Sequence, residues 1–254
     1  MSKDIASMLG GSRVVKKKIE KKKLENLAPS ATQSFSARWK VYGSHCITNF
    51  PRTDAFKDYV VQQLGQDTKK LRLATFDLDG TLTQTKTGGS FARGPGDWRW
   101  FSEVTKSKVI QEIIEKKFIL VIFTNQGGVI ASEDDKSSKS YLNFKERVNQ
   151  VVTSLGKEVP YPLVVAAPKR PKGKQKVISS EADHERMRKP ATGMFETVCE
   201  YFEDVFGDVV TIDKLESFYV GDAAGRDQDF SDSDKKFAEA IGLPFYTPEE
   251  FYDK

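Results

Sequence analysis

Short apolar runs alternate along this chain with longer segments whose apolar residues recur every three or four positions. The short runs are typical of buried strands, and the longer spacing is typical of helices that pack on one face. The predicted strands are residues 71–78, 118–124, 163–167 and 217–220. The predicted helices are residues 102–117, 140–155, a segment opening at Pro190 and residues 232–241. Strands alternating with helices predict a Rossmann-like α/β fold, in which helices cover both faces of a parallel sheet.

Polar side chains follow three of these predicted strands, at the point where each strand ends. Asp77 and Asp79 close the first run, Thr124 and Asn125 close the second, and Asp222 follows the fourth. Ligands of parallel sheets bind at the carboxyl ends of the strands. We therefore expect these side chains to share one site.

The spacing of the carboxylates suggests what this site does. Residues two apart in a strand point to the same side, so Asp77 and Asp79 can face one pocket. Two close carboxylates repel, which a hard cation such as Mg²⁺ relieves, and Asp222 would add a third oxygen ligand. One carboxylate can attack while the other transfers protons, with Thr124 donating to an oxyanion. Lys189, just before a predicted helix start, would balance the charge of a dianionic substrate.

Charge is distributed unevenly along the chain. The 254 residues carry 40 Lys and Arg against 36 Asp and Glu, a formal net charge of +4. Residues 1–40 hold ten of the basic residues and only three acids, so the remainder is slightly acidic. Residues 1–35 also contain few large apolar side chains to offset the entropy of ordering. We predict a disordered basic tail over residues 1–35 and one folded domain over residues 36–254.

Composition excludes several classes of protein. No apolar run approaches the roughly 18–20 residues of a membrane-spanning helix, and the N-terminus lacks the apolar core of a signal peptide. The two cysteines, Cys46 and Cys199, form no CxxC pair, and two histidines are too few for a zinc site. These features favour a reducing compartment, the cytosol or the nucleus.

Several motifs resemble those of a known family. DLDGT at 77–81, Thr124, Lys189 and GD at 221–222 resemble the four ordered motifs of haloacid dehalogenase-like phosphohydrolases. Narrower matches are FDLDGTL at 76–82, VIFTNQ at 121–126, RKPATGM at 188–194, YVGDAAGR at 219–226 and GLPFYTPEEF at 242–251. Together they resemble the phosphatase domain of polynucleotide kinase 3′-phosphatases over roughly residues 70–253.

The resemblance implies a mechanism and a fold. It implies a haloacid dehalogenase-like phosphatase domain with a small cap or none. Asp77 would attack phosphorus to give an aspartyl-phosphate, while Asp79 would protonate the departing 3′-oxygen and later deprotonate water. The Asp77 carboxylate, the Asp79 backbone carbonyl and Asp222 would hold Mg²⁺. Thr124, Asn125 and Lys189 would hold the phosphate oxygens.

The resemblance also implies a substrate and a setting. The substrate would be DNA with 3′-phosphate ends at strand breaks, and the protein would be a monomeric, nuclear enzyme of DNA repair. A kinase domain would carry a Gly-x-x-x-x-Gly-Lys-Ser/Thr loop, but neither Lys157 nor Lys174 is followed by Ser or Thr. We therefore expect a stand-alone 3′-phosphatase of the fungal type that binds no nucleoside triphosphate.

Two groups of residues are candidates for contact with DNA. Trp98 beside Arg99 is suited to stacking on unpaired bases, although packing in the core is an equally ordinary use of tryptophan. Lys169, Arg170 and Lys172 belong to a basic run within the long segment 168–183. This run would follow a DNA backbone or form a solvated loop.

Alternatives stay open for the supporting acids and for the function. Asp227, Asp229 and Asp234 lie near a helix start, where acids are favoured by the helix dipole, so a role beside the metal ligands is one of two interpretations. A phosphatase of the same fold acting on a small metabolite is one alternative function, and the basic loop and tail argue against it. A catalytically idle DNA-end-binding adaptor is another, and the intact aspartates argue against it.

Overall fold

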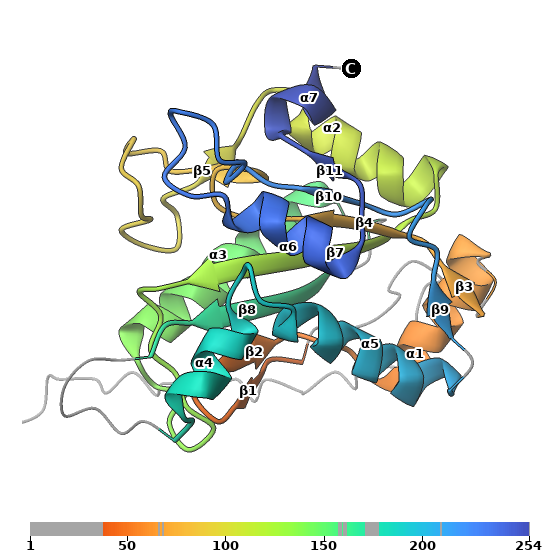
Figure 1. The fold of residues 1–254 in the computed structure, drawn as a ribbon, viewed down its shortest axis with the longest axis horizontal. Coiled ribbons are helices and arrows are strands. Elements are labelled where there is room, and N and C mark those ends of the chain that lie inside the picture. The colour runs from red at the N-terminus through yellow and green to blue at the C-terminus, as the bar shows by residue number, and fades with distance from the viewer. Residues whose placement is uncertain are drawn as a thin grey trace, which may run out of the picture. The chain divides into compact units, whose positions relative to one another are not determined.

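The computed structural model describes residues 38–253 apart from residues 66, 68, 157, 158, 160, 161, 171–177 and 209 (Figure 1). The expected basic tail, residues 1–35, lies outside the described residues, and so does Lys172. The description below concerns the unit that follows Ser30.

A seven-stranded sheet forms the centre of this unit and confirms the predicted fold class (Figure 1). Its strands are β1 Lys40–Tyr42, β2 Cys46–Thr48, β4 Leu73–Phe76, β7 Ile119–Gln126, β8 Leu163–Pro168, β10 Phe218–Val220 and β11 Phe245–Tyr246. They are ordered β1-β2-β8-β7-β4-β10-β11. Neighbours from β8 to β11 in this order run parallel, and the β1–β2 hairpin adds two strands to one edge, with β2 antiparallel to β8.

The four predicted strands are present, but the first is divided in two. The run 71–78 forms β3 Lys70–Leu71 and then β4. β3 pairs with β9 Thr211–Ile212 in a separate two-stranded sheet, so the chain changes its strand partners around Arg72. A hydrophobicity pattern cannot predict this division, because Leu71 and Leu73 are both buried, one in each sheet.

Helices cover both faces of the central sheet, as predicted. Their bounds are α1 Thr53–Asp58, α2 Thr105–Ile110, α3 Lys139–Leu155, α4 Glu181–Met187, α5 Gly193–Phe206, α6 Ser233–Ile241 and α7 Pro248–Tyr252, with the π-helical turns η1 Tyr59–Leu64 and η2 Gln111–Glu115 continuing α1 and α2. One core cluster joins the sheet to α1, α5 and α6 through Phe56, Phe202 and Phe237. The other joins the opposite face to α2 and α3 through Val109 and Phe144.

Three helices differ from the prediction. The helix expected over residues 102–117 begins at Thr105 and ends in the π-helical turn η2. The helix expected to open at Pro190 begins at Gly193, after a bend at Ala191 and Thr192. In α3, the apolar spacing of residues 140–155 that predicts the helix includes Leu142, yet Leu142 is 48% exposed, whereas Arg147 as a whole residue is only 5% exposed. The buried stripe of α3 therefore includes a charged residue, and Leu142 lies beside that stripe.

Sequence analysis did not predict the helices α1 with its continuation η1, α4 and α7, nor several short strands. β1, β2, β9 and β11 have two or three residues each, too few to show an alternating pattern. The same holds for β5 Thr83–Gln84 and β6 Arg99–Trp100, which pair antiparallel in another small sheet.

The sheet order brings the predicted site together. β7, β4 and β10 are neighbours and run parallel, with Phe76 paired to both Ile122 and Val220. The residues that follow these positions therefore meet at one edge of the sheet.

Within the part of the chain that the structure describes, no helix combines the length and the apolar composition that a membrane span needs.

Candidate active site

The turn after β4 fixes the first aspartate of the DLDGT motif. The Asp77 amide donates to the Val220 carbonyl at 2.9 Å, which extends the β4–β10 pairing by one residue. The chain then reverses, with the Thr83 amide donating to Leu78 at 2.9 Å and the Gly80 amide donating to Thr83 at 2.7 Å. Gly80 has a φ of +82°, in the left-handed region that glycine enters without strain.

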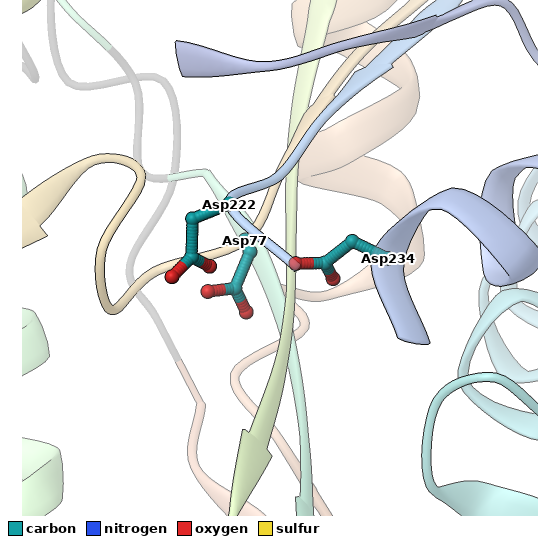
Figure 2. Close-up of side chains that lie close together, drawn as sticks. All are labelled: Asp77, Asp222 and Asp234. Atoms are coloured by element: carbon teal, nitrogen blue, oxygen red, sulfur yellow. The ribbon is translucent and has the colours of Figure 1, made fainter. Parts of the chain in front are cut away.

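Three carboxylates meet at this edge (Figure 2). Asp77, Asp222 and Asp234 each offer an oxygen, and these oxygens lie within 4.8 Å of one another. Asp77 follows β4, Asp222 follows β10, and Asp234 belongs to the first turn of α6. Asp77 and Asp234 are buried and Asp222 is half-buried. The structure thus brings together two of the three predicted metal ligands, Asp77 and Asp222, with Asp234, one of the three acids whose role was open. The Asp79 side chain, which the spacing placed in one pocket with Asp77, is not part of this cluster.

The ammonium group of Lys189 bridges two of these carboxylates. Its Nζ lies 2.6 Å from Asp77 Oδ1 and 2.7 Å from Asp234 Oδ1. It also donates to the Phe123 carbonyl and to the Tyr219 hydroxyl, each at 2.9 Å. The Tyr219 hydroxyl in turn donates to Asp234 at 2.8 Å. Lys189 is therefore a buried, fully bonded cation beside Asp77.

Lys189 alone does not balance the negative charge of the site. Burial raises the pKa of Asp77 well above its usual range, and Asp234 and Asp222 raise it further against the effect of Lys189. Burial, followed by Asp234, raises the pKa of Asp222 to about 7. Burial opposes the charge of Lys189, but the two carboxylates beside it prevail and raise its pKa. The site therefore favours the protonated, charged form of Lys189 and disfavours the ionised forms of Asp77 and Asp222.

A divalent cation fits this donor set. Three carboxylates against one ammonium leave two negative charges in excess, and carboxylate oxygens are the ligands that Mg²⁺ prefers. Asp234 is already engaged, since Oδ1 bonds Lys189 and Oδ2 accepts from the Ala223 amide at 3.0 Å. The carboxylates of Asp77 and Asp222 would therefore hold the cation. A contribution of the Asp79 backbone carbonyl stays a prediction.

The Asp79 side chain has a different set of partners. The Arg147 guanidinium forms a bidentate ion pair with it, with Nη1 on Oδ1 and Nη2 3.1 Å from Oδ2. Gln126 Nε2 also donates to Asp79 Oδ2 at 2.8 Å, and to Thr124 Oγ1 at 2.9 Å. Asp79 is thus tied to α3 on one side and to the end of β7 on the other.

Sequence reasoning missed three residues of this site. Arg147 lies three residues after Phe144 and four before Val151, so a charge on the apolar stripe of a helix was the available signal. Gln126 stood inside the VIFTNQ motif without a role assigned to it. Tyr219 stood in an apolar run, where it was indistinguishable from an ordinary core residue.

Asn125 faces the main chain of Lys189. Its Nδ2 donates to the Lys189 carbonyl at 3.1 Å, and its Oδ1 accepts from the Lys189 amide at 3.0 Å. These two bonds hold the backbone from which the Lys189 ammonium projects. Direct binding of phosphate by Asn125 or Thr124 stays a prediction.

One family model matches residues 72–252, and its description is Polynucleotide kinase 3 phosphatase. The chain belongs to this family. The matched range agrees with the range over which the motifs suggested the resemblance, and it contains the whole carboxylate cluster together with Lys189 and Arg147.

Relatives of this polynucleotide kinase 3-phosphatase family member cover most of the chain. The Polynucleotide 3′-phosphatase of Saccharomyces cerevisiae is 31% identical over 237 residues, covering 82% of this chain and 99% of the yeast protein. An uncharacterized 20.8 kDa protein of Autographa californica nuclear polyhedrosis virus is 35% identical, covering 72% of this chain and 86% of the viral protein. The Bifunctional polynucleotide phosphatase/kinase of Schizosaccharomyces pombe is 33% identical, covering 76% of this chain but 40% of that protein.

The aromatic candidate for DNA contact is partly engaged within this family member. Trp98 is half-buried, donates to Gln150 at 3.2 Å and packs edge-on against Trp100 with ring centroids 5.8 Å apart. Arg99 is exposed and donates to Gln84 at 3.2 Å. Both side chains keep accessible surface, and their contact with DNA stays a prediction.

The basic candidates lie at the border of the described residues. Lys169 and Arg170 are exposed, and Arg170 forms an ion pair of 2.9 Å with Glu181. Lys172 falls in the range 171–177, outside the described residues. Contact between this run and DNA stays a prediction.

The three acids with open roles differ from one another. Asp234 supports Lys189, as described above. Asp229 accepts from the amides of Ala224 and Arg226, each at 3.0 Å, and from the Arg226 guanidinium, so it shapes the loop after Asp222. Asp227 is exposed.

Asp234→Asn is expected to loosen Lys189 without removing a reacting group. Breaking a buried ion pair typically costs about 3–5 kcal/mol, and we expect less here because Asp77 remains beside the ammonium. Phosphate release should fall by about tenfold or more, the effect typical of removing a supporting partner. Denaturant unfolding and steady-state kinetics measure the two effects. Unchanged stability and activity would show that Asp77 alone fixes Lys189.

Proposed function

We propose that this chain is a Mg²⁺-dependent polynucleotide 3′-phosphatase that converts the 3′-phosphate ends of broken DNA into 3′-hydroxyl ends. Membership of the family supports phosphatase chemistry, and the relatives that bear the name polynucleotide 3′-phosphatase support the substrate class. The observation that carries the proposal is the buried Lys189 ammonium 2.6 Å from Asp77 at the end of a central strand. A fixed cation beside Asp77 supports the proposal that this carboxylate attacks a phosphate dianion.

The reaction proceeds in two halves. An Asp77 oxygen bonds to phosphorus as the bond from phosphorus to the sugar 3′-oxygen breaks, which gives an aspartyl-phosphate. In the substrate complex Asp79 would carry a proton, which it donates to the departing 3′-oxygen as it becomes the carboxylate that pairs with Arg147. Water then attacks the phosphorus and gives its proton to Asp79, and inorganic phosphate leaves as the Asp77 carboxylate is restored. Lys189 offsets the negative charge gathered around Asp77 throughout.

Mg²⁺ is the cation that we propose for the carboxylates of Asp77 and Asp222. Bound there, it would neutralise charge on the transferring phosphoryl group. Uncatalysed hydrolysis of phosphate monoesters is so slow that enzymes accelerate it by up to about 10²¹-fold. A nucleophile, a proton-transfer group and fixed cations acting together suit that demand.

Matched oligonucleotides carrying one 3′-phosphate or one 5′-phosphate test the proposal, together with small phosphoesters. Selective release from the 3′ end with Mg²⁺, abolished by a chelator, would support it. Activity that persists in the chelator would contradict the metal requirement. DNA binding without turnover would favour the idle adaptor, and preferential hydrolysis of small esters would favour the metabolite phosphatase.

We also propose that the protein is located in the nucleus and that it is a monomer. The Lys-rich stretch at residues 14–23 fits a nuclear localisation signal or a nonspecific tether for DNA. Fusion of residues 1–35 to a fluorescent protein tests the first role. Light scattering of the whole chain tests the monomer.

Deletion of residues 1–35 is expected to leave the chemical step intact. Every residue placed in the reaction lies between Asp77 and Asp234. Single-turnover release from a short 3′-phosphorylated oligonucleotide should therefore match that of the whole chain at saturating enzyme. Affinity for long DNA should fall at low salt, because phosphate contacts by lysines depend on ionic strength. A large loss in the single-turnover rate would place part of the reaction machinery in the tail.

A further inference from the structure

Arg147 is a charged residue on the buried face of α3. Its side chain is 7% exposed, and its neighbours on the same stripe, Phe144, Val148 and Val151, are buried. A guanidinium in such surroundings is costly unless it is paired, and both oxygens of Asp79 pair with it. The described polar contacts of Arg147 are with Asp79, so Asp79 is the side chain through which Arg147 would act on a polynucleotide.

Asp79 is the accessible member of this pair. Its side chain is 41% exposed, and Gln126 adds a hydrogen bond of 2.8 Å to Oδ2. A guanidinium that binds both carboxylate oxygens fixes the plane of the carboxylate as well as its position. Asp79 lies outside the carboxylate cluster of the described residues, which consists of Asp77, Asp222 and Asp234. Its side chain bonds Arg147 and Gln126 instead.

We propose that Arg147 is a positioning residue that aims the Asp79 carboxyl group for proton transfer in both halves of the reaction. The inference rests on the proposed function. In the first half, Asp79 gives its proton to the sugar 3′-oxygen as the bond from phosphorus to that oxygen breaks. In the second half, the Asp79 carboxylate takes a proton from the water that attacks the aspartyl-phosphate. Arg147 neither gains nor loses a proton.

The way in which the loss of kcat/KM depends on the leaving group distinguishes a positioning role of Arg147 from simple support of the fold. The alkoxide of a sugar leaves poorly without a proton, whereas p-nitrophenolate leaves well without one. The parameter kcat/KM reports only the steps up to departure of the leaving group. In Arg147→Met we expect kcat/KM to fall by about 10²-fold or more for a 3′-phosphorylated oligonucleotide, the scale of general acid catalysis. For p-nitrophenyl phosphate it should change little.

The second half of the reaction gives an independent readout. Poor activation of water in Arg147→Met should make hydrolysis of the aspartyl-phosphate limiting with p-nitrophenyl phosphate. Rapid mixing should then show a burst approaching one p-nitrophenol per enzyme, and acid-quenched protein should carry the phosphate. Single-turnover experiments with enzyme in excess measure the rate of leaving-group release for both substrates, even where steady-state turnover is slow.

Further variants keep the test decisive. Arg147→Lys keeps the charge but loses the two-pronged contact, and it should show the same selective loss, which serves where Arg147→Met fails to fold. In an Asp79→Asn background, Arg147→Met should add little, because it acts through Asp79. Arg186→Met is the matched control, since Arg186 is exposed and pairs with Glu196 on the surface. It should behave as the wild type.

The outcomes separate the inference from the function on which it rests. Equal losses on both substrates with no burst would show that Arg147 only supports the fold. Unchanged kinetics on both substrates would show that Asp79 needs no positioning by Arg147. A wild-type protein inactive on the 3′-phosphorylated oligonucleotide would instead overturn the proposed function.

Discussion

Asp77→Asn should lower phosphate release from a 3′-phosphorylated oligonucleotide by at least about 10⁴-fold, the scale seen when a nucleophile is removed. A carboxamide has nearly the shape of a carboxylate, so it fills the same buried position at the end of β4. It cannot form the aspartyl-phosphate in place of the carboxylate. Steady-state kinetics with Mg²⁺ measure the loss, and acid-quenched protein should carry no phosphate.

The same variant should not lose stability in buffer without metal. Burial raises the folded-state pKa of Asp77, so above its unfolded pKa the ionised carboxylate is less favourable in the folded protein than in the unfolded chain. Asparagine removes that unfavourable charge, and Lys189 keeps Asp234 as a partner. We therefore expect a Tm at pH 7 equal to or above that of the wild type. Mg²⁺ should raise the Tm of the wild type more than that of Asp77→Asn, because the variant lacks one ligand.

A control and a contradictory result complete this test. Asp208→Asn makes the same exchange at an exposed position after α5 and should leave activity and Tm unchanged. An Asp77→Asn protein with nearly wild-type activity would remove Asp77 from the role of nucleophile. A clear fall in its Tm would mean that the ion pair with Lys189 outweighs the cost of the buried charge.

The sequence was sufficient to predict the centre of this fold because the central strands lie in continuous apolar runs that polar residues follow directly. Residues 118–124 correspond to β7, and Leu163–Pro168 and Phe218–Val220 fall where apolar runs predicted strands. The rule that ligands gather at the carboxyl ends of parallel strands then grouped Asp77 with Asp222.

The remaining features depend on contacts between distant residues, which leave no local pattern. Arg147 meets Asp79 across 68 positions of sequence, and Lys189 meets Asp77 across 112. The pairing of Asp79 with Arg147 needs the angle at which α3 packs on the sheet. Asp229 and Asp234 are both acids near a helix start, so the sequence does not distinguish their roles. Only the three-dimensional structure shows that Asp234 pairs with Lys189 while Asp229 bonds the loop after Asp222.

Gly80→Ala is expected to disrupt the site through Asp222 rather than through the backbone alone. A Cβ atom at position 80 would lie 2.7 Å from Asp222 Cγ, whereas nonbonded carbon atoms pack at about 3.5–4.0 Å. The Asp222 carboxylate must therefore move by roughly 1 Å, and a displacement of that size can cost about 10²-fold in rate. Phosphate release should fall by at least that factor, and the Mg²⁺ concentration giving half-maximal activity should rise.

Gly88→Ala separates the displacement of Asp222 from the strain of the backbone. Gly80 and Gly88 have φ values of +82° and +73°, so alanine at either position suffers a similar left-handed penalty of about 1–2 kcal/mol. A Cβ atom at Gly88 meets nothing within 4 Å. Both variants should therefore lose similar stability in denaturant unfolding, while only Gly80→Ala loses activity and affinity for Mg²⁺. Equal losses of activity in the two would attribute the effect to backbone strain, and full activity in Gly80→Ala would show that Asp222 tolerates the displacement and does not set the cation site.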